Sequence, residues 1–564
     1  MEHTPTPANS LSQANTVLPA ASSSAAHAAG ASTPTLAQRH VLVLGLGASG
    51  LAMARWCARS GAQLTVADSR QEPPQLAALQ HDVPQVRFVA GSFAPELLAP
   101  DVCAVFVSPG LSPADTHSVL DAARQKGLWV GGELDLFVHA LGQLQQERGY
   151  APKVLGITGT NGKTTVTALT GQLLARAGQT VAVAGNIGPT LLGTLTQALQ
   201  ADALPQSWVL ELSSFQLNNC TVFEPTAATC LNITQDHLDW HGSIENYTAA
   251  KANIFGKYGT AILNRDDPAV MALLAQLQPA SEAANLPKSA SPAKAAKATK
   301  GSKAPAVRAW SSFGAGLPER AGDFGLEHVN GMTWLVRAAA TDDAAPAKSN
   351  RAAAGDKSSS EDIYIQRLMP ADALRIRGRH NACNALAALA LAEQAGAALA
   401  PMLYGLREYR GEPHRVEPVG SIAGVEYFDD SKGTNVGATL AALQGLGAQH
   451  KLVAILGGEG KGQDFAPLAA AVRSSCRAVV LIGRDAPLLA QSLQESGVPL
   501  IHASSMQEAV QAASAQAQAG DAVLLSPACA SFDMFKDYIH RAEAFRQAVQ
   551  TLAQEQGIML EGTP

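Results

Sequence analysis

The chain has 564 residues, of which 47% are hydrophobic and 16% are charged, and its formal net charge is −6 at pH 7. This composition is typical of a soluble globular protein with several domains, and the mild acidity argues against general nucleic-acid binding. The seven cysteines form no Cys-x-x-Cys pair, so the sequence suggests neither a disulfide framework nor a zinc site. A reducing cytoplasm fits this usage best.

The first 38 residues are rich in Ala, Ser, Thr and Pro and contain no Lys or Arg. They lack the basic start and the continuous apolar core of a secretory signal, so we expect a disordered tail. No stretch is typical of a membrane span, because the Ala-rich run over 385–400 carries Glu393 and Gln394. That run instead predicts one buried helix.

A first domain is predicted over residues 39–148, and it begins with a strand, a glycine turn and a helix. The turn Gly45-x-Gly47-x-x-Gly50 follows the apolar run from Val41, and Asp68 closes the next strand. This order is typical of dinucleotide-binding sheets, although any ribose-bearing or anionic ligand can use the same turn. A dinucleotide therefore stays open as the less favoured ligand.

A second domain is predicted over residues 149–412 and is organised around a phosphate loop. The apolar strand Val154–Ile157 breaks into Gly159-Thr-Asn-Gly162, and a helix is expected from Lys163. Glycines there let backbone N–H groups face a phosphate, Lys163 can reach the outer phosphates, and Thr164 can ligate Mg²⁺. The loop departs from the full Walker A pattern, which has a glycine where this chain has Ile157.

Further polar groups stand at the ends of neighbouring predicted strands. Glu211 ends the apolar run from Trp208, and a carboxylate at that edge suits Mg²⁺ held directly or through water. Asp236 and His237 follow the next strand and could serve a metal or a substrate, although a lone histidine is more often structural. Lys251 lies on a predicted helix, and from the residues alone we interpret it as a solvated charge.

Two stretches, about 280–306 and about 338–360, are rich in Ala, Lys, Pro and Ser and predict flexible surface insertions. After the second stretch, His380, Asn381 and Asn384 stand where a helix begins. Since asparagine is a preferred N-cap, we expect at least one of these side chains to cap that helix.

A third domain is predicted over residues 413–564, where strands and helices alternate as in a doubly wound sheet. Its strand ends carry lysine and hydroxyl donors, which suit a small carboxylate substrate. The predicted fold class is therefore α/β with three domains: a Rossmann-like N-terminal domain, a central parallel sheet of the P-loop ATPase type, and a Rossmann-like C-terminal domain.

The motifs, taken together and in order, resemble the Mur amino-acid ligases. They are Gly159-Thr-Asn-Gly-Lys-Thr, Glu211-Leu-Ser-Ser-Phe-Gln, Asp236-His237, Tyr247-x-x-x-Lys251, His380-Asn381-x-x-Asn384, His414-Arg415, Asp430-Ser-Lys-x-Thr-Asn435 and Gly457-Gly-x-Gly-Lys461. Within that family, the motifs that start at Gly45 and Glu211, and the ending from Leu524 to Asp533, resemble the members that add D-glutamate. The resemblance covers about residues 40–555.

The resemblance implies ATP-dependent ligation of D-glutamate to UDP-N-acetylmuramoyl-L-alanine through an acyl phosphate, with Mg²⁺, giving ADP and phosphate. It places a monomer in cytoplasmic peptidoglycan precursor synthesis, without nucleic-acid or membrane partners. A sister ligase that adds another amino acid is the nearest alternative. A nicotinamide oxidoreductase is a more distant one, because it leaves the phosphate loop unexplained.

The resemblance also implies roles for individual residues. It makes Lys163, Lys251, His237 and Lys432 catalytic, and it assigns the metal ions to Thr164, Glu211, His237 and a carbamylated Lys251. ATP is assigned to Gly159, Thr160, Asn161, Gly162, Lys163, Thr164, Thr165, Asn384, His414, Arg415 and Asp430. The UDP-sugar is assigned to Ala48, Ser49, Gly50, Asp68, Ser69, Arg70, Ser108, Gly110, Asn186 and His237. D-Glutamate is assigned to Lys432, Thr434, Lys461, Ser531, Phe532 and Tyr538.

Two positions depart from the family's pattern. Ala542 follows Arg541 where the family often has glycine, and Tyr538 stands where phenylalanine also occurs. We expect neither change to touch a catalytic group.

Overall fold

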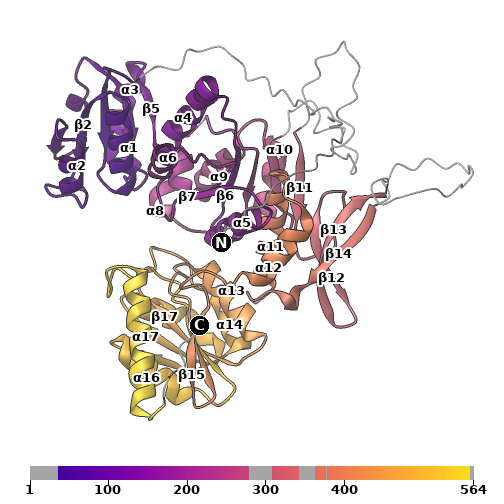
Figure 1. Ribbon diagram of the computed structural model, residues 1–564. Coiled ribbons are helices and arrows are strands. Elements are labelled where there is room, and N and C mark those ends of the chain that lie inside the picture. The colour runs from indigo at the N-terminus through magenta and orange to yellow at the C-terminus, as the bar shows by residue number, and fades with distance from the viewer. Residues whose placement is uncertain are drawn as a thin grey trace, which may run out of the picture. The chain divides into compact units, whose positions relative to one another are not determined.

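The computed structural model describes residues 36–220, 222–277, 308–341, 363–376, 378–558 and 560, which contain three β-sheets flanked by helices (Figure 1). The predicted α/β class is confirmed, because parallel strand pairs dominate all three sheets. The predicted tail up to residue 35 and the predicted insertion at 280–306 lie outside the described residues.

The first sheet is parallel and has the order β3-β2-β1-β4-β5. Its strands are β1 (His40–Leu44), β2 (Gln63–Asp68), β3 (Arg87–Ala90), β4 (Val102–Val107) and β5 (Trp129–Gly131), with helices α1 (Ala48–Arg59), α2 (Leu76–Asp82), α3 (Pro113–Gln125) and α4 (Glu133–Arg148). Alternate residues of β1 face opposite sides. Val41 and Val43 join the apolar cluster that contains α1 and α4, whereas Leu42 and Leu44 pack with α3.

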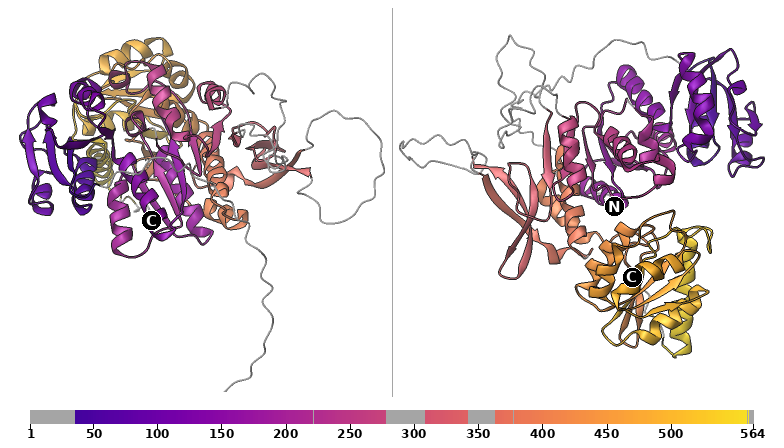
Figure 2. Two further views of the ribbon diagram at one scale, coloured as in Figure 1. Left: turned by 90° about the horizontal axis from the view of Figure 1, so that it is seen from above. Right: turned by 180° about the vertical axis from the view of Figure 1, so that it is seen from behind.

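The second sheet has nine strands in the order β14-β13-β12-β11-β10-β9-β6-β8-β7. The parallel strands are β6 (Lys153–Thr158), β7 (Val181–Gly185), β8 (Ser207–Glu211), β9 (Ala227–Cys230), β10 (Thr260–Asn264), β11 (Trp310–Phe313) and β12 (Phe324–Val329). The antiparallel edge consists of β12, β13 (Met332–Ala340) and β14 (Ile363–Pro370), a long ribbon in Figure 2.

Helices cover both faces of the parallel part of this sheet. They are α5 (Lys163–Arg176), α6 (Leu191–Gln200), α7 (Ser214–Asn218), α8 (Leu238–His241), α9 (Ile244–Ala252), α10 (Pro268–Leu277), α11 (Arg379–Gln394) and α12 (Leu399–Glu408). On one face α5 and α11 pack against Leu155 and Ile157 of β6. On the other face α6 and α10 share a cluster with the first sheet's helices.

The single helix predicted over 385–400 is wrong, because the structure has two helices there, α11 and α12. Gly396 lies between them with a φ of +86°, a left-handed backbone that ends helices and that glycine adopts at little cost. Pro401 falls in the first turn of α12, where its missing N–H has no partner to lose.

The second predicted insertion, about 338–360, is wrong at its first residues. Ala338, Ala339 and Ala340 continue β13 and pair with residues of β14. Because the three side chains are equally small, this stretch shows no alternation of apolar and polar residues, and the sequence did not predict a strand. The length of the strand is decided by hydrogen bonds to β14. Residues 342–362 lie outside the described part of the chain.

The third sheet has the order β15-β16-β20-β17-β18-β19 and is parallel except for β15. Its strands are β15 (Glu417–Ile422), β16 (Val425–Asp429), β17 (Leu452–Gly457), β18 (Cys476–Ile482), β19 (Leu500–His502) and β20 (Ala522–Leu525). Its helices are α13 (Val436–Gly447), α14 (Leu468–Ser475), α15 (Ala486–Leu493), α16 (Met506–Gln516) and α17 (Tyr538–Glu555).

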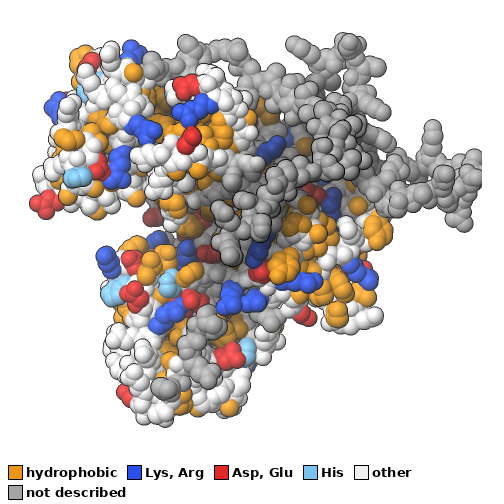
Figure 3. All heavy atoms as spheres, viewed as in Figure 1, with side chains coloured by type: hydrophobic (Ala, Val, Ile, Leu, Met, Phe, Trp, Pro, Cys, Tyr) orange, Lys and Arg blue, Asp and Glu red, His pale blue; other side chains and the backbone are white. Residues whose placement is uncertain are grey.

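Across the described residues, no helix combines the length and the hydropathy that a membrane span needs. On the face seen in Figure 3, basic and acidic side chains are interspersed among apolar ones.

Candidate active site

The phosphate loop joins β6 to α5, as the sequence predicted. Its two glycines have left-handed backbone, with φ of +147° at Gly159 and +83° at Gly162. A Cβ atom at Gly162 would also lie 2.9 Å from Asn384 Oδ1. Glycine is therefore required at 162 by both backbone conformation and space, and it brings the loop against the start of α11.

The loop that follows β9 holds the phosphate loop in place through Asn232. The carbonyl oxygen of Asn232 accepts from Thr160 N at 2.9 Å, and its side-chain oxygen accepts from Asn161 N at 2.8 Å. The Thr160 hydroxyl lies 3.1 Å from the hydroxyl of Tyr247 on α9. These bonds organise the loop before any ligand arrives, which lowers the entropic cost of binding.

Lys163 begins α5 and folds its side chain over the loop. Its Nζ donates to the carbonyl oxygens of Gly159 and Thr160, each at 2.8 Å. Burial lowers the pKa of Lys163, and the charges of Glu211 and Asp236 oppose that effect. A partly desolvated cation at a helix N-terminus attracts phosphate groups.

Glu211 ends β8 beside this loop and is buried, with 1% of its surface exposed. Its Oε1 accepts from Asn186 Nδ2 at 3.0 Å. Its Oε2 is buried without a hydrogen-bond partner among the described residues. Because a buried carboxylate oxygen is costly when left unpaired, this atom is suited to a cation.

His237 follows β9 in a left-handed conformation, with a φ of +52°. Its backbone N–H donates to Asp236 Oδ1 at 3.1 Å, and its ring packs edge-on against Phe215. Burial lowers the pKa of His237, and the neighbouring Asp236 opposes that effect. A neutral imidazole is the form that binds metals.

Lys251 is not the solvated charge that the residues alone predicted, because α9 packs it against the phosphate loop with 1% of its surface exposed. Its Nζ donates to Gly159 O at 2.9 Å and lies 4.5 Å from the centroid of the Tyr247 ring. Burial, and then the charge of Lys163, lower the pKa of Lys251 to about 7. Its amine therefore titrates near neutrality.

The glycine turn of the first sheet is braced by two buried carboxylates. Asp68 accepts from Leu46 N at 2.7 Å and binds Arg70 through both oxygens. Burial raises the pKa of Asp68, but these hydrogen bonds outweigh it and hold the pKa at about 2. Ser49 donates its hydroxyl proton to Glu133 Oε2 at 2.8 Å, and the other Glu133 oxygen accepts from Leu192 N at the start of α6.

The remaining predicted sugar-side residues lie at or near strand ends. Ser108 follows β4, is buried and donates its N–H to Leu44 O, while Gly110 is exposed in the same turn. Asn186, after β7, is exposed, and its backbone N–H donates to Glu211 O at 2.8 Å. Ala48 is exposed as the first residue of α1, and Ser69 is exposed on the turn that follows β2.

In the third sheet, Asp430 and Lys432 follow β16. Burial raises the pKa of Asp430 to about 7, and Ser526 Oγ donates to its carboxylate at 2.7 Å. Burial and the charge of Arg415 lower the pKa of Lys432 to about 8. The Lys432 Nζ donates to Thr164 Oγ1 at 3.2 Å, so this residue reaches the phosphate loop.

Arg415 Nε is buried without a hydrogen-bond partner among the described residues.

The other residues predicted for D-glutamate differ in how far they are buried. Tyr538 begins α17, and its ring centroid is 5.6 Å from Lys432 Nζ. Ser531 is buried, whereas Phe532 is 66% exposed and Lys461 is also exposed. The charge of Lys461 nevertheless contributes to lowering the pKa of His237. Thr434 lies in the turn after Lys432.

The predicted capping of α11 by a polar side chain is wrong. The N-cap is Gly378, with a φ of +95°, and among the described residues no side-chain hydrogen bond caps that end. Asn384 instead donates its side-chain amide to Asn381 Oδ1 at 3.1 Å, and its oxygen faces Gly162. Glycine is preferred at such a left-handed position. The polar residues that follow Gly378 suggested a side-chain cap instead.

Three family models match successive parts of the chain. The MurD-like N-terminal domain of Mur ligases matches residues 39–132, the Mur ligase middle domain matches 157–305, and the Mur ligase glutamate ligase domain matches 414–529. A UDP-N-acetylmuramoylalanine--D-glutamate ligase of Albidiferax ferrireducens is 61% identical over 528 residues, covering 93% of this chain and 99% of that protein. The chain belongs to the Mur ligase family.

Other comparisons agree with this Mur ligase assignment. A UDP-N-acetylmuramoylalanine--D-glutamate ligase of Polaromonas sp. is 53% identical over 612 residues, covering 93% of this chain and 100% of that protein. The crystal structure of the MurF ligase of Thermotoga maritima in complex with ADP shares the fold, with a TM-score of 0.52 and 16% identity over 93% of this chain and 97% of that one. The resemblance inferred from the motifs is confirmed, and the protein is a ligase.

The sequence predicted no structural role for two buried side chains of this Mur ligase. Glu133 connects α1 to α6, as described above, and Arg541 is 1% exposed on α17. Arg541 donates to Ser431 Oγ at 3.0 Å, to Ser431 O at 2.7 Å and to Cys529 O at 3.1 Å. It therefore holds the turn between Asp430 and Lys432. No spacing rule pairs these residues, because their partners are distant in sequence.

His380 of this Mur ligase predicts a pH dependence of stability. Burial, and then the charge of Arg415, lower the pKa of His380 to about 4. An unfolded histidine binds its proton near pH 6.5, so the unfolded state alone gains protons as pH falls from about 6.5 to about 4. The free energy of unfolding should therefore fall across that window, by about 3 kcal/mol at most.

Urea titrations at pH 7.5 and pH 5 would measure this loss, and His380→Gln should reduce it. The exposed His117 of α3 supplies the matched control His117→Gln. An unchanged pH dependence in His380→Gln would contradict the assignment.

Proposed function

We propose that this ligase joins D-glutamate to UDP-N-acetylmuramoyl-L-alanine with ATP, giving ADP and phosphate, in cytoplasmic peptidoglycan precursor synthesis. The identity to proteins named for that reaction supports the choice of substrates. We also propose that it acts as a monomer whose three domains span 39–148, 149–412 and 413–564.

The observation that carries the proposal is the gathering of groups around the phosphate loop. The buried Lys251 contacts the carbonyl of Gly159, and Lys163 begins the following helix. Glu211 ends the neighbouring strand β8, and its Oε2 has no hydrogen-bond partner among the described residues. Two lysines and a carboxylate on one phosphate loop suit a nucleotide together with its metal ions. They have no use in a nicotinamide oxidoreductase.

ATP is proposed to bind the phosphate loop and the adjoining cavity. The cavity has a volume of about 900 Å³, and its lining includes Asn384, Asn264, Asp266 and Gln444. Asn384 stands between this space and Gly162, so a nucleotide with its phosphates on the loop could place its base there. His414, Arg415 and Asp430 would complete the site, and Arg415 Nε, which has no hydrogen-bond partner among the described residues, is a donor for it.

The donors near the loop fit Mg²⁺, because Glu211 Oε2 is buried without a partner among the described residues and Mg²⁺ prefers oxygen ligands. Thr164, Glu211, His237 and a carbamylated Lys251 would hold the metal ions. When bound, Mg²⁺ would screen the charge of the phosphates and polarise the γ-phosphoryl group.

The proposed reaction has two steps, and two lysines of the chain would act in both. An oxygen of the L-alanyl carboxylate attacks the γ-phosphorus of ATP, the bond to ADP breaks, and an acyl phosphate forms. The amine of D-glutamate attacks the acyl carbon, the C–O bond to phosphate breaks, and the amine loses a proton. Lys163 and Lys432 would neutralise charge that builds up on the phosphoryl oxygens in both steps.

The substrates would be aligned by the two outer domains together with two residues of the central domain. The UDP-sugar would meet the turns at Ala48–Gly50, Asp68–Arg70 and Ser108–Gly110, with Asn186 and His237 at the sugar. Since Ser49 donates its own proton to Glu133, backbone N–H groups of that turn are the donors left for a diphosphate. Lys432, Thr434, Lys461, Ser531, Phe532 and Tyr538 would surround D-glutamate.

Phosphate release with ATP, Mg²⁺ and UDP-N-acetylmuramoyl-L-alanine tests the proposal when D-glutamate is compared with L-glutamate, L-lysine, meso-diaminopimelate and L-alanine. We expect release with D-glutamate alone, and a product heavier than the UDP-substrate by one glutamyl residue in mass spectrometry. Release with another amino acid would make the chain a sister ligase. No release with any of them would contradict the proposal.

A further inference from the structure

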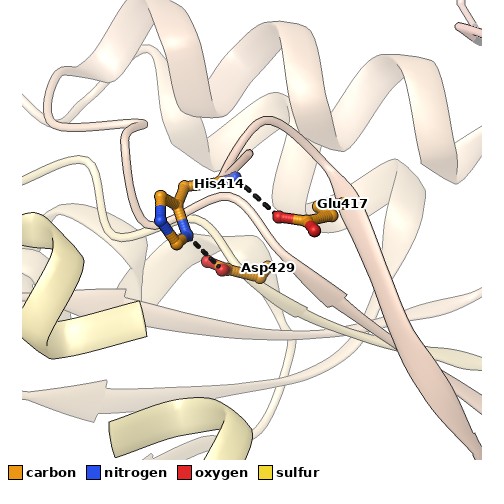
Figure 4. Close-up of side chains that lie close together, drawn as sticks. All are labelled: His414, Glu417 and Asp429. Atoms are coloured by element: carbon orange, nitrogen blue, oxygen red, sulfur yellow. Dashed lines mark hydrogen bonds and ion pairs between the residues drawn. The ribbon is translucent and has the colours of Figure 1, made fainter. Parts of the chain in front are cut away.

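His414, Glu417 and Asp429 lie together where the third sheet begins (Figure 4). The His414 Nδ1 atom is 2.8 Å from Asp429 Oδ2, and the His414 backbone N–H donates to Glu417 Oε2 at 2.8 Å. Asp429 is fully buried at the end of β16. One imidazole and two carboxylates within 4.8 Å are also the donor set of many metal sites.

Arg546 of α17 makes this cluster an ion-pair network and not a metal site. Its guanidinium pairs with Glu417 Oε2 and lies 3.4 Å from Asp429 Oδ2. It already supplies positive charge to the buried Asp429 and to the partly exposed Glu417, and a divalent ion would have to bind against it. The cluster is therefore an ion-pair network around His414.

The segment that the network holds is strained. The φ angles are +62° at His414 and +49° at Val416, and a β-branched residue rarely adopts that region. Such a backbone persists only where surrounding contacts over-determine it. Asp429 supplies two of these contacts, because its Oδ1 also accepts from Ser431 N at 2.9 Å. One carboxylate thus fixes both the His414 ring and the turn that leads to Lys432.

The turn that Asp429 fixes reaches the phosphate loop, and it is also bonded to His414. Lys432 Nζ reaches Thr164 Oγ1, and its backbone N–H donates to His414 O at 3.3 Å. Arg415, the neighbour of His414, is close enough for its charge to lower the pKa of Lys163. Whatever holds His414 therefore also sets the position of groups beside the ATP phosphates.

We propose that Asp429, supported by Arg546 and Glu417, is a positioning residue that holds His414 in the orientation that ATP binding requires. Because Nδ1 donates to Asp429, Nε2 is the ring nitrogen left for the nucleotide. This inference rests on the proposed function in its choice of ATP. It adds three residues that touch neither substrate nor metal but determine the affinity for nucleotide.

Asp429→Ala should raise the KM for ATP about tenfold, the effect of losing one hydrogen bond to a charged group, and leave the KM for the UDP-substrate unchanged. Asp429→Asn keeps an oxygen acceptor for Nδ1–H and should restore most of the affinity. Glu417→Gln should have a smaller effect of the same kind. In ¹⁵N-histidine NMR spectra, Asp429→Ala should change the His414 ring signals, and Asp429→Asn should preserve the Nδ1–H form.

Asp521 provides a matched control in the same sheet. It is a buried carboxylate paired with Arg477, and it immediately precedes β20, the strand that runs parallel beside β16. Asp521→Ala removes an equivalent ion pair at the opposite strand end, so it should lower stability without changing the KM for ATP. An equal rise of that KM in Asp521→Ala and Asp429→Ala would reduce the role of Asp429 to general stability and overturn the proposal.

Direct titration of ATP separates this inference from the proposed function, because it needs no turnover. Weaker ATP binding in Asp429→Ala would support the positioning role even if the wild-type chain released no phosphate with D-glutamate. Unchanged ATP affinity would overturn it. Zinc or cobalt retained by the wild-type chain and lost in Asp429→Ala would also overturn it, since the cluster would then be a metal site.

Discussion

Replacing Lys163 with alanine is expected to lower D-glutamate-dependent phosphate release about a thousand-fold, the largest effect of any single change considered. Lys163 is the cation at the N-terminus of α5, and its Nζ lies over the carbonyl oxygens of Gly159 and Thr160. The charge on the transferred phosphoryl group would lose one of its compensating side chains. Quenched-flow or coupled phosphate assays with saturating substrates would measure the rate.

Lys153 supplies the matched control for this experiment. It is exposed at the other end of β6, on the strand that leads into the same loop. Lys153→Ala should retain the wild-type rate, and circular dichroism should show that Lys163→Ala is folded. A folded Lys163→Ala enzyme with more than a tenth of the wild-type rate would refute the assignment of the phosphate loop.

Replacing Lys251 with either alanine or arginine is expected to lower activity about a hundred-fold, because arginine cannot form a carbamate. Carbamylation joins the neutral amine to CO₂ and releases a proton, which turns a cation into a carboxylate-like anion. The pKa of Lys251 is lowered to about 7, so the reactive neutral amine is abundant above that pH and disappears below it. Activity should therefore fall as pH drops through about 7.

Two measurements separate a carbamate from a structural ammonium group. Removal of CO₂ should lower the activity reversibly, and ¹³C-bicarbonate should give a carbamate signal in ¹³C NMR that Lys251→Arg lacks. Lys257→Arg, a change of an exposed lysine that follows the same helix, is the control and should behave as the wild type. Full activity in Lys251→Arg would show that only a positive charge is needed there.

The parts of the fold that the sequence predicted are those determined locally. An apolar run followed by two glycines and a lysine determines β6, the loop and the start of α5, because each residue's conformational preference points to the same structure. The position of Glu211 at a strand end follows from the length of its apolar run in the same way.

The parts that escaped prediction depend on contacts between distant segments. Nothing within α9 shows that Lys251 is buried, since the phosphate loop that covers it is about ninety residues earlier in the chain. The cap at Gly378 and the break at Gly396 were hidden by polar and Ala-rich neighbours. The network of His414, Asp429 and Arg546 likewise appears only when β16 and α17 pack together.

The central claim is that the chain activates a carboxylate by phosphorylating it. The most direct measurement uses UDP-N-acetylmuramoyl-L-alanine whose terminal carboxylate carries ¹⁸O, with ATP, Mg²⁺ and D-glutamate, and follows the label by mass spectrometry. The acyl-phosphate route predicts that each released phosphate carries one ¹⁸O atom from the carboxylate. Unlabelled phosphate would mean that water attacks ATP directly, and it would contradict the account.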